Sequence, residues 1–546
     1  MPKVHVKLQL LGCAATAALI ASAFAVPAQA APARAIYSGG ATFPEKAYRD
    51  IMNCYGDSSG TELETGLTAT FCNGLAGYNP NVQALYTGVG SGNGLSAWRA
   101  KNPDALNTAR TPDAVPVPSS SAFGPYYGDG VGAGWLPDTN DTGPNYPDYS
   151  FSGSDDPLTT AQLATYNTNK VPGGWGEAKQ LPALIGAVAI PYTAASGVGV
   201  TWTESGVAVS GNVSKLKLST DSLCGIYTGA ITNWNHAELT ADNGGTSLTG
   251  GGSAPITVVY RTDGSGTTFL FANALINQCA GSAHPVPASW QTADPAGTNV
   301  NVSGQSNNNW FVNVQNDPVI DLPANFVGAS GNGGVKAAVL GGQGRIGYST
   351  TDFVNLKSNK PDPTGPKAAN LQSYASFIAV PAIAPVWKAP TFGNAGKIMV
   401  PTPGQATTNY LKAPSFAKNC ATLPQGCATD PLAWGKANPA PTHTGAYPIG
   451  GFSFIDMYTC YATANEVNDL VGTTPGSLGF LRWFFGTSGE NANQPKKSLN
   501  LNGFGAIPGG YISAARKLLT TNAPTKIGTP GQPGTGCAVG VAGPGA

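Results

Sequence analysis

Short apolar runs that give way to helical patterns recur along this chain. In three segments, a run typical of a β-strand ends in a turn rich in glycine and hydroxyl residues, and an apolar pattern of helical spacing follows. A fourth segment places Asp155 and Asp156 before Pro157 and an amphipathic run. The segments are IYSGGATFPEKAYRDIM (36–52), VQALYTGVGSGNGLSAWRA (82–100), YRTDGSGTTFLFANAL (260–275) and FSGSDDPLTTAQLATY (151–166). This alternation predicts an α/β fold with ligand sites at the carboxyl ends of strands.

Two stretches interrupt the pattern. Residues 102–149 are rich in Pro, Gly, Asp and Tyr, and residues 414–446 are rich in Pro, so both are expected to be insertions. At 546 residues the chain is too long for one ordinary domain, which predicts two or more lobes.

The balance of basic and acidic residues argues against a nucleic-acid partner. The chain has 29 basic and 29 acidic residues. Because a nucleic-acid binder would show a basic patch or stripe, we expect no nucleic-acid partner. A content of 41% hydrophobic residues still supplies a substantial core.

The N-terminus has the pattern of a leader. Lys3 and Lys7 precede the apolar run 8–26, and Ala28-Gln29-Ala30 is a small-residue cleavage pattern. We therefore predict a cleaved signal peptide at residues 1–30 and a periplasmic or secreted protein. The sequence LLGC ending at Cys13 suggests a lipoprotein site, but too little apolar sequence precedes it.

Cysteine usage agrees with export. Eight cysteines follow residue 30, and an even number in an exported protein predicts disulfides. Pairing neighbours in sequence, a choice that favours short loops, gives Cys54–Cys72, Cys224–Cys279, Cys420–Cys427 and Cys460–Cys537. The alternative is a metal site. It is disfavoured because no CxxC pair occurs and only His236, His284 and His443 remain after residue 30, so we predict no metal and no cofactor.

The glycine and hydroxyl turns suit an anion. The first N–H groups of a helix have no partner within the helix, and the macrodipole adds partial positive charge there. Such an end binds anions, and glycine lets the backbone approach them closely. Arg261 adds a charged fork suited to oxyanions, and Asp263 could hold that fork in place. Three such ends meeting at one point could replace the hydration shell of a small tetrahedral oxyanion.

Each motif alone has an ordinary structural explanation. Ser91 could be a helix cap, Asp155 a cap or turn residue, and Arg261 a member of a surface ion pair. The GSGTT turn also lacks the Gly-Lys-Ser/Thr ending of a nucleotide P-loop.

In combination, the motifs resemble the substrate-binding proteins of phosphate-specific ABC transporters. GGATFP (39–44), YTGVGSGNG (86–94), FSGSDDPL (151–158) and RTDGSGTTF (261–269) occur in that family's order, and LCGIYTGAITNWN (223–235), GNGGV (331–335) and GRIGY (344–348) add to the likeness. The matching segments are scattered from about residue 36 to 520. The resemblance implies a two-lobed α/β fold, the type II periplasmic-binding-protein fold, with a hinge and a ligand cleft between the lobes. It places lobe 1 at 36–186 plus 447–546 and lobe 2 at 187–446.

The resemblance also implies the phosphate contacts, carried over position by position. They are Thr42, Phe43, Ser91, Asp155, Arg261, Ser265, Gly266 and Thr267, with Asp263 supporting Arg261. Asp156 stands where the family has a small residue, so either Asp155 or Asp156 could face the ligand. An ionised carboxylate only accepts hydrogen bonds, so it favours protonated phosphate over sulfate. Arsenate, with the same protonation pattern, is expected to bind as well.

The predicted function is therefore that of a monomeric, non-catalytic phosphate receptor, the extracytoplasmic partner of an ABC permease in a bacterium. Two alternatives stay open. One is a secreted phosphate scavenger or surface protein with no permease, because the insertions could block docking. The other is a secreted phosphatase, although no GxSxG motif occurs and Ser265 has no evident general base.

Overall fold

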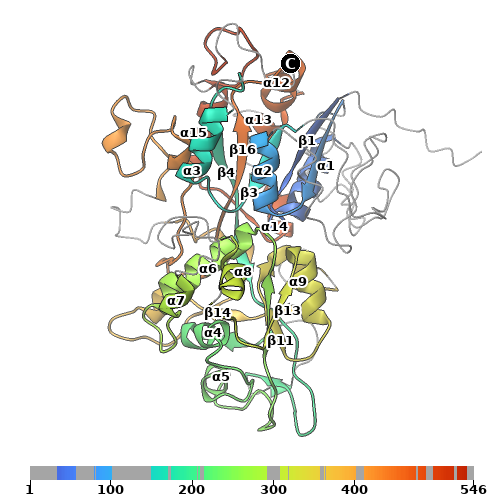
Figure 1. Ribbon diagram of the computed structural model, residues 1–546, viewed down its shortest axis with the longest axis vertical. Coiled ribbons are helices and arrows are strands. Elements are labelled where there is room, and N and C mark those ends of the chain that lie inside the picture. The colour runs from blue at the N-terminus through green and yellow to red at the C-terminus, as the bar shows by residue number, and fades with distance from the viewer. Residues whose placement is uncertain are drawn as a thin grey trace, which may run out of the picture.

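Two separate β-sheets form the frame of the protein, one in each half of the molecule (Figure 1). The structure is a computed structural model. It describes residues 34–56, 79, 81–100, 149–169, 174–205, 207–208, 214–291, 308–317, 319–356, 362, 364–400, 411–474, 477–486, 496–521 and 526–537. The predicted signal peptide and nearly all of the predicted insertion at 102–149 lie outside these residues.

The larger sheet has seven strands in the order β12-β4-β16-β3-β1-β2, with β17 paired to β4. Its parallel members are β1, β2 and β3, and β16 runs antiparallel to β3 and β4. The strands are β1 (Arg34–Gly40), β2 (Val82–Gly88), β3 (Phe151–Ser154), β4 (Ala178–Ala189), β12 (Ser349–Thr350), β16 (Gly450–Tyr458) and β17 (Gly505–Ala506). Every residue of β3, β4 and β16 is buried, as expected for strands covered on both faces.

Helices from both ends of the chain surround this sheet (Figure 1). They are α1 (Glu45–Gly56), α2 (Ser91–Ala100), α3 (Thr160–Asn169), α12 (Ala464–Val471), α13 (Phe480–Phe484), α14 (Lys496–Leu501) and α15 (Gly509–Thr520). Stacked rings help to fix them, for example Trp98 of α2 on Tyr166 of α3 with centroids 4.9 Å apart.

The second sheet has the order β10-β9-β11-β5-β13, with β9 parallel to both of its neighbours. Its strands are β5 (Pro191–Tyr192), β9 (Thr257–Arg261), β10 (Phe326–Ala329), β11 (Arg345–Gly347) and β13 (Lys367–Ala368). The helices of this half are α4 (Thr220–Tyr227), α5 (Ala237–Asp242), α6 (Gly266–Cys279), α7 (Ala288–Gln291), α8 (Trp310–Asn316), α9 (Gly331–Leu340) and α10 (Tyr374–Phe377).

Two small sheets complete this half. One has the order β15-β14-β8 and the other pairs β6 with β7. Their strands are β6 (Thr203–Glu204), β7 (Val207–Ala208), β8 (Lys217–Leu218), β14 (Asn370–Gln372) and β15 (Trp387–Lys388). This arrangement confirms the predicted two-lobed α/β class.

The chain passes between the sheets more than once. β4 stays in the larger sheet as far as Ala189, past the predicted boundary at residue 186, and β5 begins the second sheet at Pro191. β11 belongs to the second sheet, whereas β12, two residues later, pairs with β4.

Part of the segment that the sequence assigns to lobe 2 packs on the larger sheet. The helix α11 (Phe392–Ala395) and the 3-10 helix η5 (Pro431–Trp434) both contact β4. The Gln180 side chain on β4 donates to the Pro431 carbonyl at 3.0 Å, and Trp434 is fully buried. The second passage between the lobes therefore lies well before residue 446.

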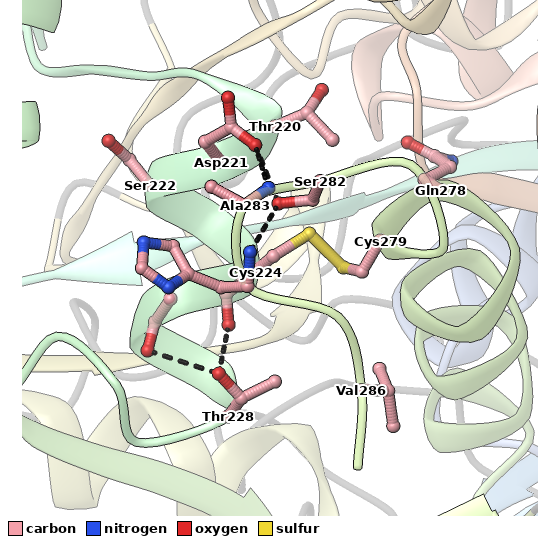
Figure 2. Close-up of a disulfide and its surroundings, with 12 residues drawn as sticks. Thr220, Asp221, Ser222, Cys224, Thr228, Gln278, Cys279, Ser282, Ala283 and Val286 are labelled. Atoms are coloured by element: carbon pink, nitrogen blue, oxygen red, sulfur yellow. Dashed lines mark hydrogen bonds between the residues drawn. A yellow bond between two sulfur atoms is a disulfide. The ribbon is translucent and has the colours of Figure 1, made fainter. Parts of the chain in front are cut away.

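Three disulfides join the pairs that neighbour-to-neighbour pairing predicts. Cys224–Cys279, Cys420–Cys427 and Cys460–Cys537 have Cα–Cα distances of 5.7, 4.9 and 4.9 Å. The first fastens the last residue of α6 to α4 (Figure 2). The predicted pair Cys54–Cys72 includes a residue outside the described part of the chain.

Among the described residues, no helix combines the length and the apolar character that a bilayer crossing requires.

Candidate functional site

Three strand-to-helix turns meet where the two sheets face each other. β1 and β2 end at Gly40 and Gly88, and α1 and α2 begin a few residues later. β9 ends at Arg261 in the other half, and α6 begins at Gly266. The turns that the hydrophobic pattern singles out thus come from both halves of the molecule.

Hydrogen bonds join these turns directly. The Ser91 hydroxyl oxygen accepts from the backbone N–H of Gly266 at 3.1 Å and from that of Asp155 at 3.2 Å. The Gly92 N–H donates to the Gly264 carbonyl at 3.1 Å. These bonds hold the first lobe against the start of α6, so the structure is a closed form.

Arg261 is the charged centre of the site, and its side chain is fully buried. Its guanidinium donates to both oxygens of Asp263, from Nε at 2.6 Å and from Nη2. Nη1 donates to the Asn332 side-chain oxygen at 2.9 Å, and to Thr267 Oγ1 at a longer 3.5 Å. Nη2 also reaches Thr42 Oγ1 of the first lobe at 3.2 Å. These bonds hold the Arg261 guanidinium in one orientation, and the bonds to Asp263 match its predicted role of supporting Arg261.

Asn332 is a site residue that no prediction named. Its side chain accepts from Arg261 and donates to Thr42 Oγ1 at 3.1 Å, so it links the arginine of one lobe to a hydroxyl of the other. The only sequence signal is the GNGGV motif at the start of α9, which the family resemblance includes. Tyr348 is also unforeseen. Its hydroxyl accepts from the Arg261 N–H at 3.0 Å and lies 2.9 Å from Thr268 Oγ1.

The adjacent carboxylates Asp155 and Asp156 differ in their partners. Asp156 accepts from Ser154 Oγ at 2.9 Å with one oxygen and from Asn308 Nδ2 at 2.9 Å with the other. Asp155 is as deeply buried, yet its Oδ1 has no hydrogen-bond partner among the described residues. Of the two, Asp155 has acceptor capacity left for a donor that this part of the protein does not supply.

The pKa values of Asp155 and Asp263 are shifted in opposite directions. Burial raises the pKa of Asp155 well above its ordinary value, although the nearby Ser453 hydroxyl and the Arg261 charge act in the opposite direction. Burial also acts to raise the pKa of Asp263, but the ion pair with Arg261 and the N–H of Gly331 hold it below its ordinary value. Asp263 is thus fixed in its charged form.

The start of α6 has a capping serine whose hydroxyl group can still donate a hydrogen bond. Ser265 is the N-cap, and its side chain accepts from the Thr268 N–H at 3.1 Å. This leaves the Ser265 hydroxyl hydrogen available to an anion. A β-carbon added to Gly266 would lie 2.5 Å from both Asp155 Cβ and Ser91 Oγ, so only glycine permits this close approach of the lobes.

The side chain of Phe43 packs in the core, whereas its backbone lies at the site. Its ring packs edge-on against Phe504, with centroids 5.3 Å apart, and lies against Gly186. Only its backbone can therefore contribute to a ligand, whereas the Thr42 hydroxyl is already in contact with Arg261. All eight residues that the resemblance implies lie in or beside this meeting of turns.

Comparison with known proteins shows to which family the chain belongs. A family model described as a PBP superfamily domain matches residues 26–488, most of the chain. The chain belongs to the PBP superfamily. This match and the relatives described next confirm the resemblance that the motifs predict.

Curated relatives of this PBP superfamily member carry two kinds of name. A phosphate-binding protein from an unknown prokaryotic organism is 28% identical over 435 residues, which cover 77% of this chain and 93% of that protein. Phosphate-binding protein PstS from Xylella fastidiosa is 26% identical over 63% of this chain and 66% of its own. Alkaline phosphatase L from Pseudomonas aeruginosa strain UCBPP-PA14 is 25% identical over 80% of this chain and 79% of its own.

Solved structures show the same fold. A high affinity periplasmic phosphate-binding protein, PfluDING, bound with phosphate, superposes with a TM-score of 0.51 at 22% identity. A phosphate-binding protein from Stenotrophomonas maltophilia gives a TM-score of 0.52 at 20% identity. Each match covers 90% of this chain and 96% of the other.

Proposed function

We propose that this PBP superfamily protein binds inorganic phosphate between its lobes and acts as the extracytoplasmic receptor of a phosphate ABC transporter. One observation carries the proposal: a buried Asp155 oxygen, without a partner among the described residues, lies at the meeting of three helix starts and a fixed arginine. The phosphate-binding names of the relatives support it.

The chemistry of Asp155 favours phosphate over sulfate. Phosphate at neutral pH keeps at least one proton, which can be donated to a carboxylate, whereas sulfate has none. In its charged form, which the Ser453 hydroxyl and the Arg261 charge favour, the Asp155 carboxylate facing sulfate would meet like charge and leave a buried acceptor unpaired. A site that requires one donor rejects an analogue lacking it by about 10⁴-fold. Arsenate, which is protonated in the same way, should compete with phosphate.

The remaining proposed ligands are donors. Arg261 supplies the charge; the hydroxyl groups of Thr42, Ser91, Ser265 and Thr267 and the amides of Phe43 and Gly266 supply hydrogen bonds. Several of these groups bond to one another in the closed structure, so a ligand would exchange with contacts between the lobes. The bond from the Gly266 N–H to Ser91 Oγ is one that an entering oxyanion would replace, because both groups are proposed ligands.

Delivery to a permease, a periplasmic location and a monomeric state belong to the same proposal. The predicted leader and the likeness to a periplasmic phosphate-binding protein support export. A secreted scavenger without a permease would have the same site. Phosphate uptake by cells lacking this gene separates the two, because only the receptor should change the uptake rate.

A phosphatase is the second candidate, because three relatives are named alkaline phosphatase L. The described histidines have other partners: His284 lies 2.9 Å from Glu238, and His236 caps α5. His443 accepts from the Gly445 N–H at 3.0 Å. No hydrogen bond joins any of these three described histidines to Ser265, whose side chain accepts from the Thr268 N–H. Release of phosphate from a monoester that is lost in Ser265→Ala would establish the enzyme instead.

Equilibrium dialysis with radiolabelled phosphate tests the binding proposal. Phosphate-stripped protein should retain about one phosphate per chain, and arsenate should displace it while excess sulfate should not. A folded sample that retains no label would overturn the proposal.

A further inference from the structure

An entirely apolar loop projects from the second lobe, away from the candidate phosphate site. Residues 377–387 read FIAVPAIAPVW, eleven positions of apolar and aromatic residues. Val380 is 96% exposed, Ile383 52% and Ile378 43%, and every residue from 380 to 386 is exposed. Contiguous apolar surface of this kind marks a binding surface, since isolated exposed apolar residues are the usual case.

The base of the loop is firmly held. β14 and β15 pair on either side of it, with Gln372 opposite Trp387. The Ser373 N–H donates to the Val386 carbonyl at 2.8 Å, and the Val386 N–H donates to Ser376 Oγ at 3.1 Å. These bonds occupy the backbone groups at the base of the loop, so the fold itself presents the apolar side chains to solvent.

Two lysines, Lys217 and Lys388, lie at the base of the loop. Lys388 follows the loop on β15, and the Lys217 ammonium lies 5.7 Å from the centre of the Trp387 ring. Lys388 and Lys397 each lie close enough to His443 for their positive charges to lower its pKa. Residues 363–429 contain five lysines and no acidic residue, although the whole chain has equal numbers of basic and acidic residues.

We propose that the loop 377–387 inserts into the surface of an anionic lipid bilayer, with Lys217 and Lys388 contacting the headgroups. Apolar side chains at a tip and lysines behind them match the layers of such a surface. A specific protein partner is less well matched, because protein interfaces are rich in Tyr, Trp and Arg, whereas the exposed tip offers only Val, Ile, Ala and Pro.

This surface would leave the cleft free. Phe377 lies close to Gly281, just beyond the last residue of α6, since a β-carbon on Gly281 would be 3.9 Å from the Phe377 ring. The candidate phosphate site lies at the opposite end of α6, about 20 Å away along a 14-residue helix. Lipid contact and phosphate binding therefore use different ends of the same helix.

Vesicle flotation tests the proposal on the exported protein, in excess phosphate so that the cleft is saturated. We expect binding to vesicles of phosphatidylcholine mixed with an equal amount of phosphatidylglycerol. It should weaken at high salt and be much weaker on phosphatidylcholine alone. The variant V380D/I383D should reduce bound protein at least about tenfold, and K217Q/K388Q should reduce it less.

V319D is the matched control, because Val319 is 87% exposed in the same lobe but lies between α8 and β10. It should float like the unaltered protein, and all variants should keep phosphate binding as evidence of folding. Absence of flotation, equal binding to neutral vesicles, or full binding by V380D/I383D would each overturn the proposal. Self-association that is lost in V380D/I383D, without vesicle binding, would assign the loop to a second copy of the chain.

Discussion

Two carboxylates from opposite lobes of the candidate site, Asp263 and Asp155, behave in opposite ways. Asp263 receives two bonds from Arg261 and one from Gly331, and its pKa lies below the ordinary value. Asp155 is more deeply buried, with 1% of its surface exposed; one of its oxygens has no partner within the described chain, and its pKa is raised. The difference teaches that partners, more than burial, decide what a buried carboxylate does here.

The two halves of the site have correspondingly different tasks in the proposed function. The second-lobe half is complete before ligand arrives, since Asp263 and Asn332 hold Arg261. The first-lobe half contains the group that still needs a donor. Affinity should therefore depend chiefly on the arginine side, and discrimination among anions on the aspartate side.

Removing the arginine should have the largest effect on affinity. Arg261→Ala deletes the charge and leaves Asp263 buried without its partner, a loss of about 2–5 kcal/mol for a buried, hydrogen-bonded pair. Calorimetry should show phosphate binding weakened by about 30-fold or more. Arg516→Ala, on α15 with a bond to the Gly486 carbonyl, is the control and should bind normally. Unchanged phosphate affinity in a folded Arg261→Ala sample would contradict the claim that affinity depends chiefly on the arginine side of the site.

Closure can be tested with two neighbouring glycines. Gly266→Ala would place a β-carbon 2.5 Å from Asp155 Cβ, whereas the nearest atom to a β-carbon on Gly92 is 3.5 Å away. Overpacking of this kind costs about 1–3 kcal/mol, so Gly266→Ala should weaken phosphate binding and hold the lobes apart in X-ray scattering. Gly92→Ala should close normally. Equal phosphate affinity and equal lobe closure in the two variants would contradict the close contact between Gly266 and Asp155.

Loss of the Asn332 link should have a smaller effect. Asn332→Ala removes one partner from Arg261 and one from Thr42 but leaves Asp263 in place. We expect a loss of about 1.5 kcal/mol in phosphate affinity, roughly tenfold. Asn235→Ala, at an exposed position far along the second lobe, serves as the control. If Asn332→Ala weakened phosphate binding as much as Arg261→Ala does, Asp263 could not be the main group that holds Arg261 in place.

The smallest expected effect is on stability. Because the pKa of Asp155 is raised in the folded state, its favourable contribution is present below the ordinary carboxyl pKa and is lost as pH rises through the folded value. Without phosphate, Asp155→Asn should therefore melt a few degrees higher than the unaltered protein at neutral pH, and the difference should vanish in acid. Melting curves across pH measure this directly.

Asp456→Asn is a useful comparison for that experiment. Asp456 is fully buried on β16, both its oxygens lack hydrogen-bond partners among the described residues, and burial raises its pKa. It should show the same sign of stabilisation without any change in anion preference. A change in anion preference in this variant would mean that selectivity is not specific to Asp155.

Much of the site could be predicted from local sequence. Glycine, serine and threonine between a strand and a helix have a local physical reason, so the pattern alone indicates the turns at 42, 91 and 261–267. Asn332 could not be found in this way. It lies 71 positions from Arg261, and its role arises only when β10 pairs with β9 and brings the start of α9 beside the arginine.

The choice between Asp155 and Asp156 and the extent of the lobes also depended on tertiary contacts. Neighbouring carboxylates look alike in sequence, and only the partners Ser154 and Asn308 distinguish Asp156. Residues 431–434 have no strong periodicity, so their packing on β4 could not be read from the chain.

The most direct test of the central claim is the ratio of phosphate to sulfate affinity, measured by calorimetry for the unaltered protein and for Asp155→Asn. We predict tight one-to-one phosphate binding with no sulfate heat in the former. In Asp155→Asn the ratio should fall by several orders of magnitude, because an amide can donate to sulfate. An unaltered ratio in a folded, phosphate-binding Asp155→Asn sample would contradict the assignment of Asp155 as the selective group.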